Sequence, residues 1–235
     1  MAVHDSDRSS SPSEQPPPEA PGTAPASMPH PAVRRLSLYL RQLETFAGQG
    51  RHTVSSRDLG RALGLGDAQV RKDLANFGSF GQSGVGYRVE ELIGRLRRIL
   101  GTDRSWDVVL MGAGNVGRAL LAFRPFAEKG FRLVAVFDSD TRLHGQEFGG
   151  VKVQSPQEMV PTVRRLGAKL AVMAVPAEAA QRACDALVAA GVRGILNFAP
   201  VTLKVPEGVA VNSVDLVVQL EQIAFQVNAS EGESA

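Results

Sequence analysis

The sequence predicts an α/β fold in which an N-terminal winged helix-turn-helix domain is followed by a Rossmann-type parallel-sheet domain and a C-terminal helix. Three observations indicate this organisation. Apolar residues recur at helical spacing over residues 33–100, interrupted by a glycine-rich stretch at 78–87. Short apolar strands alternate with helix-length segments from residue 107 onward. A G-x-G-x-x-G motif at residues 112–117 joins the first of these strands to a helix.

Length and composition are ordinary for a soluble globular protein with two small domains. The chain has 235 residues, of which 43% are hydrophobic and 21% are charged. No apolar run approaches the roughly 20 residues of a transmembrane helix, and the start MAVHDSDRSS lacks the features of a secretory signal. The single cysteine, Cys184, excludes an internal disulfide and a cysteine-only metal site. We therefore expect a cytoplasmic protein without membrane partner or metal.

Charge is distributed unevenly along the chain. Residues 34–104 carry 13 Lys and Arg against seven Asp and Glu, a net charge of +6. Residues 1–33 have a net charge of −3, and residues 105–235 a net charge of −1. A basic segment beside a nearly neutral one suggests that one part binds a polyanion. A solvated basic surface is the alternative, and charge by itself does not decide between them.

The first domain, residues 32–104, begins with an amphipathic helix that ends near Gly48. Ser55, with Asp58 three residues after it, is a typical N-cap for a short second helix that ends at Gly64.

A third helix follows the turn at residues 64–66 and begins near Asp67. Its inward face is formed by Val70, Leu74 and Phe77, and its outward arc by Ala68, Gln69, Arg71, Lys72 and Asn76. The glycines of residues 78–87 permit a tight hairpin. A fourth helix then extends over residues 89–100 and stops at Gly101.

This order of elements is typical of a winged helix-turn-helix, in which the second helix of the pair enters the major groove of DNA. Arg71 and Lys72 have the reach for guanine edges or phosphates, and Gln69 is suited to adenine. A small helical domain used for packing or dimer contact is the alternative. The charge of +6 confined to this segment favours double-stranded DNA as the partner.

The second domain, residues 105–212, alternates apolar strands with helices, which indicates βαβ units and a parallel sheet. The strands are expected at residues 107–111, 131–137, 170–175 and 194–198. In the glycine motif, Gly112 allows the tight turn, Gly114 lets the backbone approach a pyrophosphate, and Gly117 lets helix and strand pack closely. The cofactor-binding loop is therefore expected to comprise Gly112, Ala113, Gly114, Asn115, Val116 and Gly117.

Asp138 ends the second strand, 21 residues beyond Gly117. A carboxylate at this position accepts hydrogen bonds from the adenosine ribose and repels a 2′-phosphate, which predicts NAD(H) rather than NADP(H) as the cofactor. The nearby Arg142 leaves that preference open. CoA-binding domains share this architecture, so CoA or another nucleotide is the alternative ligand.

A terminal helix is expected at residues 213–228. Its polar residues form one narrow stripe, so its apolar arc is wider than one flank of a domain usually covers. Such a helix is either enclosed within its own chain or packed on another subunit. Residues 1–31, rich in Pro and Ser, and the tail 229–235 are expected to be disordered.

Several stretches resemble the redox-sensing transcriptional repressor family called Rex, over residues 32–228. They are RLSLYLRQLE (35–44), VSSRDL (54–59), AQVRKDLANFGSFG (68–81), GVGYRV (84–89), VPAEAAQ (175–181), GILNFAP (194–200) and VPEGVAV (205–211). The resemblance implies a homodimer that binds an inverted-repeat operator in double-stranded DNA. It implies release by NADH, with NAD+ competing, and exchange of the terminal helix between protomers.

The resemblance also assigns residues. It implies DNA contact by Ser55, Ser56, Arg71, Lys72, Gly86 and Tyr87, and contact with the nicotinamide half of the cofactor by Val175, Pro176, Asn197 and Phe198. Asp215 matches an Asp that takes part in the switch of the family.

The chain departs from the family pattern at two positions. Phe123 stands where the family places a switch Tyr, so a Tyr–Asp hydrogen bond is impossible here. Ser83 stands where the family usually has a basic wing residue, and we expect weaker operator affinity because of it.

An NAD-dependent oxidoreductase is the remaining alternative. Such an enzyme needs a proton donor near the nicotinamide and a substrate domain, but a single helix follows the last expected strand. We therefore expect no enzymatic activity and no catalytic residue.

Overall fold

The computed structural model describes residues 30–77 and 86–232, and the chain divides into two units between Gly101 and Thr102. The division falls three residues before the domain boundary expected at residue 104. Most of the expected N-terminal tail and the expected wing tip, including Ser83, lie outside the described residues.

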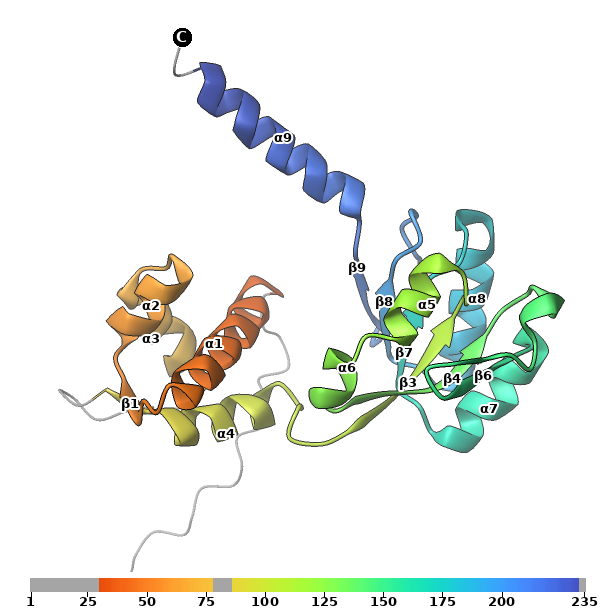
Figure 1. Ribbon diagram of the computed structural model, residues 1–235, viewed down its shortest axis with the longest axis horizontal. Helices are drawn as coiled ribbons and strands as arrows, with labels where there is room; N and C mark the ends of the chain where they lie inside the picture. Colours follow the sequence, from red (N-terminus) through yellow and green to blue (C-terminus); the bar gives the residue numbers. More distant parts are fainter. Residues whose placement is uncertain (1–29, 78–85, 233–235) are drawn as a thin grey trace, which may run out of the picture. The chain divides into compact units, whose positions relative to one another are not determined.

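The first unit contains four helices and a two-stranded antiparallel ribbon among its described residues (Figure 1). The helices are α1 (His30–Gly48), α2 (Ser56–Leu63), α3 (Asp67–Ala75) and α4 (Val89–Ile99), and the strands are β1 (Thr53–Val54) and β2 (Tyr87–Arg88). Their buried residues form one core that includes Leu36, Tyr39, Leu43, Leu59, Val70, Leu74, Val89 and Leu96. The expected helices are confirmed, although α1 already begins at His30, inside the segment assigned to the tail.

Local sequence explains the helix-turn-helix. The Ser55 hydroxyl accepts a hydrogen bond from the Asp58 amide at 3.1 Å, and the Asp58 carboxylate accepts one from the Ser55 amide at 3.0 Å. This capping box confirms the predicted start of α2. Gly64, at φ 67°, ends the helix in the left-handed conformation. A Cβ on the buried Gly60 would lie 2.6 Å from the Leu65 carbonyl oxygen, so the turn closes tightly against α2.

The second unit is built on a seven-stranded sheet in the order β5-β6-β4-β3-β7-β8-β9. The expected strands are confirmed as β3 (Trp106–Met111), β4 (Phe131–Phe137), β7 (Leu170–Met173) and β8 (Gly194–Asn197). Sequence reasoning missed β5 (Glu147–Phe148), β6 (Val151–Gln154) and β9 (Ala210–Ser213). All neighbours are parallel except β5 and β6. From β3 the chain continues to β4 and β6 on one side of β3, and it then crosses back to β7 on the other side. The strand order therefore reverses between β3 and β7.

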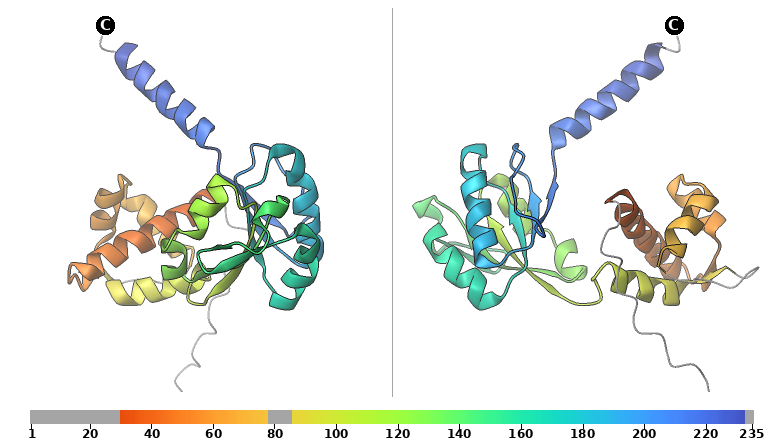
Figure 2. Two further views of the ribbon diagram at one scale, coloured as in Figure 1. Left: turned by 45° about the vertical axis from the view of Figure 1, so that its right-hand side comes forward. Right: turned by 180° about the vertical axis from the view of Figure 1, so that it is seen from behind.

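Helices cover both faces of this sheet (Figure 2). They are α5 (Asn115–Leu121), α6 (Pro125–Glu128), α7 (Met159–Leu166) and α8 (Ala177–Ala190). Alternate residues of β3 point to opposite faces, so Val109 joins the core under α7 and α8, whereas Leu110 joins the core next to α5. Cys184 is fully buried in the first of these cores, and burial raises the pKa of its thiol.

The terminal helix α9 extends over Leu216–Gly232. The expected start at residue 213 was wrong because Ser213 ends β9, and the helix continues into residues assigned to the C-terminal tail. Its large apolar side chains are exposed, Leu216 to 66% and Phe225 to 74%. Across residues 30–77 and 86–232 no helix has the length and apolar character to cross a membrane.

Candidate functional site

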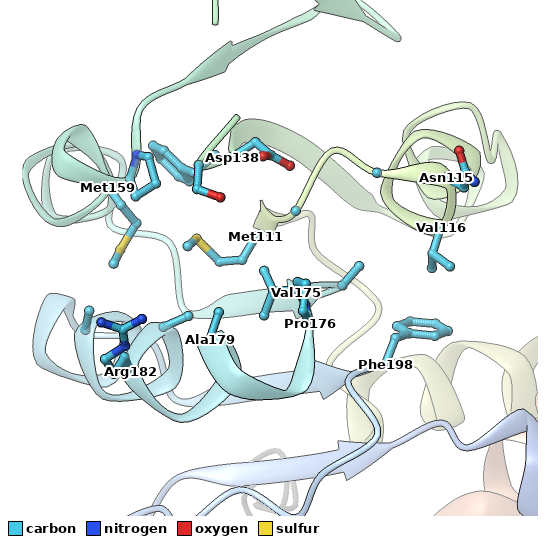
Figure 3. A pocket seen from close by; sticks show the side chains of 18 residues that line it. Met111, Asn115, Val116, Asp138, Met159, Val175, Pro176, Ala179, Arg182 and Phe198 are labelled. Atoms are coloured by element: carbon cyan, nitrogen blue, oxygen red, sulfur yellow. The ribbon is translucent and has the colours of Figure 1, made fainter. Parts of the chain in front are cut away.

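A cavity of about 720 Å³ opens at the carboxyl ends of β3, β4 and β7, where the strand order reverses (Figure 3). Ligands of open parallel sheets bind at such points. Eight of the residues expected to bind the cofactor line it: Gly112, Gly114, Asn115, Val116, Asp138, Val175, Pro176 and Phe198. The expected Ala113, Gly117 and Asn197 are not among its lining residues.

Each of the three positions in the loop is occupied by glycine for a different physical reason. Gly112 adopts φ 98°, and a Cβ there would lie 2.3 Å from the Ala174 carbonyl oxygen. A Cβ on Gly117 would lie 1.9 Å from the Gly112 carbonyl oxygen. The packing of the protein itself therefore requires both. Gly114 has no such need, because a Cβ there would meet nothing within 4 Å. The space that its missing side chain leaves belongs to the cavity, as a closely approaching pyrophosphate requires.

Asp138 is fixed at the end of β4. Its Oδ2 accepts a hydrogen bond from the Ala113 amide at 2.6 Å, and its Oδ1 accepts one from the Asp140 amide at 2.8 Å. Each carboxylate oxygen retains a further acceptor site, so the group can still accept hydrogen bonds from two ribose hydroxyls. A hydrogen bond thus links the glycine loop directly to the Asp138 carboxylate.

Arg142 is held by its neighbour Asp140 rather than directed to a ligand. Its Nε and Nη2 donate to the Asp140 carboxylate at 2.9 and 2.7 Å. Hydrogen bonds from the Arg142 side chain and backbone lower the pKa of Asp140 to about 2. The Arg142 guanidinium is therefore paired with Asp140, although its side chain is 87% exposed.

Toward the end of the cavity where Phe198 lies, the lining is mainly apolar, with Val116, Val175, Pro176 and Phe198 and the polar Asn115 next to Val116 (Figure 3). Asn197 acts behind this surface. Its fully buried amide donates to the carbonyls of Ala199 and Val201 at 3.1 and 3.0 Å. Asn197 can therefore affect a ligand through the loop it fixes, and not by direct contact in this conformation.

Sequence reasoning missed the lining residues beyond Asp138, which include Ser139, Pro156, Met159 and Arg182. A signal was present in α8. Ala179, Arg182, Ala183 and Ala186 recur at helical spacing after the expected strand at 170–175, and all four face the cavity.

In the first unit, the structure brings several of the expected DNA-contacting residues together. Arg71 donates to the Ser56 hydroxyl at 3.2 Å and to Asp67 at 2.7 Å, and Arg71 and Lys72 are exposed on α3. Burial raises the pKa of Tyr87, and the nearby charge of Arg71 opposes that shift.

Three expected DNA-contacting residues have structural duties of their own. The Ser55 hydroxyl is engaged in the capping box of α2. Gly86 adopts φ 88°, and a Cβ there would lie 2.5 Å from the Val54 carbonyl oxygen, so the ribbon itself requires glycine. The side-chain amide of Gln69 donates a hydrogen bond to the buried carboxylate of Asp73 at 2.8 Å.

The two expected switch residues lie in the second unit. Phe123 follows α5, is 51% exposed, and contacts Phe126 edge to face at 5.2 Å between ring centroids. Asp215 precedes α9, and its Oδ1 accepts hydrogen bonds from the amides of Val217 and Val218 at 2.9 and 3.1 Å. Among the described residues, no group of His, Cys, Asp and Glu has the geometry to hold a metal ion.

Comparison with known proteins gives matches for both units. Residues 103–201 match the family model described as a CoA binding domain, and residues 27–75 match a putative DNA-binding protein N-terminus. The redox-sensing transcriptional repressor Rex of Streptomyces coelicolor is 44% identical over 92% of this chain and 83% of its own length. Rex of Carboxydothermus hydrogenoformans is 46% identical over 85% of this chain and 96% of its own length.

Solved structures match over nearly the whole chain. The structure of RSP in complex with β-NAD+ and operator DNA has a TM-score of 0.84 and 35% identity, over 89% of this chain and 96% of that one. RSP in complex with β-NADH has a TM-score of 0.81 and 34% identity, over 88% and 97% of the two chains. RSP is described as a Rex-family repressor.

Proposed function

This chain belongs to the Rex family of redox-sensing transcriptional repressors, and we propose that it binds operator DNA through its first unit and is released when NADH occupies the cavity of the second. The observation that carries this proposal is the division of one cavity into two chemically different ends. Gly114 leaves room for a pyrophosphate, and the Asp138 carboxylate offers acceptors to the ribose beside it.

The apolar end supplies the redox preference. NADH and NAD+ share the adenosine diphosphate half and differ at the nicotinamide, which is neutral in NADH and cationic in NAD+. Burial of a cation against Val116, Val175, Pro176 and Phe198 costs more free energy than burial of the neutral ring. The lining therefore favours NADH, and the contacts made there are the ones that decide between the two redox forms.

On the DNA side, the outward face of α3 carries Gln69, Arg71 and Lys72. Arg71 is hydrogen-bonded to Ser56 of α2 and lies close to Tyr87. We propose that two copies bind the two half-sites of an inverted repeat. The exposed apolar side chains of α9 would be covered by the second copy, as the exchange of the terminal helix within the family implies. NADH would then stabilise the arrangement of the two copies that does not fit both half-sites.

We propose no enzymatic activity. The titratable residues among those lining the cavity are Asp138 and Arg182, and neither is at the apolar end. A dehydrogenase needs a proton donor beside the nicotinamide. The similar proteins described above are named as repressors, and a repressor that binds operator DNA works in the cytoplasm.

CoA is the second candidate ligand, because residues 103–201 match a CoA binding domain. CoA carries a 3′-phosphate on its adenosine ribose, next to the position where the Asp138 carboxylate would bind that sugar. Like charges at this distance disfavour CoA relative to a dinucleotide with free ribose hydroxyls.

An operator-binding titration tests the proposal. The full chain selects duplexes from a random pool, and its affinity for the selected duplex is measured by fluorescence anisotropy at one salt concentration. Saturating NADH should weaken binding at least tenfold, whereas NAD+ should restore it and CoA should have no effect. Equal affinity in saturating NADH and NAD+ would refute the sensor.

A further inference from the structure

The cavity continues past Asp138 into a second region, away from the apolar lining that is proposed to distinguish the two redox forms. If Gly114 faces the pyrophosphate and Asp138 the ribose, the base of the adenosine must lie beyond Asp138, among Pro156, Met159 and Arg182. Figure 3 shows Met159 and Arg182 at the same end of the cavity, one on each side of it, with Phe198 at the other end.

The two sides of this region differ in character. Met159 begins α7 and is only 3% exposed, so it presents a small apolar surface to the cavity. Arg182 projects from the second turn of α8, where Ala179 and Ala183 leave space around it. Its side chain is exposed, and no acidic side chain among the described residues is paired with it. A planar cation thus faces an apolar surface across an opening.

We propose that Arg182 stacks its guanidinium on the adenine of the bound dinucleotide, on the side of the cavity across from Met159, and so sets the affinity for NADH and NAD+ together. The planar guanidinium stacks on aromatic faces, and it is less strongly hydrated than an ammonium group. The inference rests on the proposed function, because it assumes a dinucleotide in this cavity.

This placement separates two properties of a redox sensor. Adenosine is identical in NADH and NAD+, so a contact with it changes both affinities by the same factor. Arg182 would therefore determine the dinucleotide concentration at which the repressor responds. The ratio of NADH to NAD+ at which it responds would still be decided at the apolar end.

The test compares Arg182→Ala and Arg182→Lys with Arg165→Ala, which removes an exposed arginine of α7 that does not line the cavity. Calorimetry on the full chain measures the affinity for NADH, NAD+, ADP-ribose and reduced nicotinamide mononucleotide. In Arg182→Ala the first three should each weaken by the same factor, roughly five- to thirtyfold. Binding of the mononucleotide, which lacks adenosine, should not change. Arg165→Ala should match the wild type for every ligand.

Arg182→Lys distinguishes stacking from charge alone, because lysine retains the charge without the plane. It should recover less than half of the lost binding free energy. Full recovery by lysine, unchanged affinities in Arg182→Ala, or a loss confined to one redox form would each overturn the assignment. A wild-type chain that binds ADP-ribose but not NADH would refute the proposed function instead, and the ADP-ribose titration of the variants would still test Arg182.

Discussion

Arg35 on α1 donates two hydrogen bonds to the carboxylate of Asp73 on α3, from Nε to Oδ2 at 2.5 Å and from Nη2 to Oδ1 at 2.8 Å. Asp73 is only 2% exposed and also accepts hydrogen bonds from the Tyr39 hydroxyl at 2.7 Å and the Gln69 amide at 2.8 Å. One buried carboxylate therefore joins α1 to the helix that carries the proposed DNA-reading side chains.

Replacing this carboxylate should destabilise the first unit. In Asp73→Asn, one acceptor oxygen is lost, and the partly buried charge of Arg35 has no counter-charge. We expect a loss of about 2–4 kcal/mol in the free energy of unfolding. Urea denaturation followed by circular dichroism gives the total, and hydrogen exchange of the α1 and α3 amides localises it. Glu90→Gln, which changes an exposed carboxyl group of α4, should leave the midpoint nearly unchanged.

The same group makes stability depend on pH. Burial raises the pKa of Asp73, but hydrogen bonds from Arg35, Tyr39 and Gln69 outweigh burial and leave the pKa below its ordinary value. The folded state then holds this proton less tightly than the unfolded state. The stability that the Asp73 carboxylate contributes is fully present above its pKa in the unfolded chain, which is about 3.9. That contribution is lost as the pH falls through the pKa of Asp73 in the folded protein. The stability difference between wild type and Asp73→Asn should be constant from pH 7 to 5 and narrow below about pH 4. A difference that stays constant into acid would contradict this linkage.

Gln69 should read adenine while Asp73 orients it. Its Nε2 carries two hydrogens, and the bond to Asp73 uses one, so the other hydrogen and Oε1 remain for the two hydrogen-bonding positions of adenine. Gln69→Ala should lower the discrimination at one operator base pair by about 1–3 kcal/mol. Operator selection with wild type and variant measures this directly. Lys72→Ala is the matched control, and it should weaken all sequences nearly uniformly and reduce the salt slope.

Two glycines of the same motif should respond in opposite ways to alanine. Gly117→Ala places a methyl group against the Gly112 carbonyl and should destabilise the second unit by about 2 kcal/mol or more. In Gly114→Ala the new Cβ has no protein atom within 4 Å, and the φ of −68° suits alanine, so the stability of the second unit should be retained. The methyl group occupies the space proposed for the pyrophosphate, and NADH affinity should fall at least tenfold. Thermal denaturation and calorimetry separate the two effects. Retained NADH affinity in Gly114→Ala would place the pyrophosphate elsewhere.

Sequence patterns predicted the long elements well because burial repeats along them. The helices of the first unit and strands β3, β4, β7 and β8 follow from periodicity, and the capping box from the Ser55–Asp58 spacing. Strand β5 has only two residues, and β6 (VKVQ) and β9 (AVNS) lack the continuous apolar run that marks β7 (LAVM), which also has four residues.

The site was only partly predictable for a different reason. Glycine spacing reports a backbone requirement, which is local in sequence, and it located the loop and Asp138. Whether a side chain faces a ligand or its own loop depends on packing. Asn197 is fully buried, which the spacing of residues does not reveal. Arg182 shares one face of α8 with Ala179, Ala183 and Ala186, but spacing alone does not say that this face lines the cavity. The same holds for Asp73, whose partners Arg35 and Tyr39 lie 38 and 34 residues away along the chain.

The redox preference should move with the charge at the apolar end. Val116 is the second residue of α5 and is 48% exposed, so Val116→Asp introduces a carboxylate beside the proposed nicotinamide. Both dinucleotides should bind more weakly, because the new charge repels the pyrophosphate they share. The cationic ring of NAD+ is attracted in addition, so the affinity of NAD+ relative to NADH should rise roughly three- to tenfold.

Val116→Asn is the control for Val116→Asp, because asparagine has nearly the same shape as aspartate but carries no charge. Calorimetric titration of both variants with both dinucleotides gives the two ratios, and operator release should then require a higher proportion of NADH in Val116→Asp than in Val116→Asn. Because the attraction is electrostatic and partly exposed, added salt should shrink the difference. An unchanged ratio would mean that the nicotinamide does not lie at this end of the cavity. The adenine would then lie here, and the preference for NADH could not come from the apolar lining.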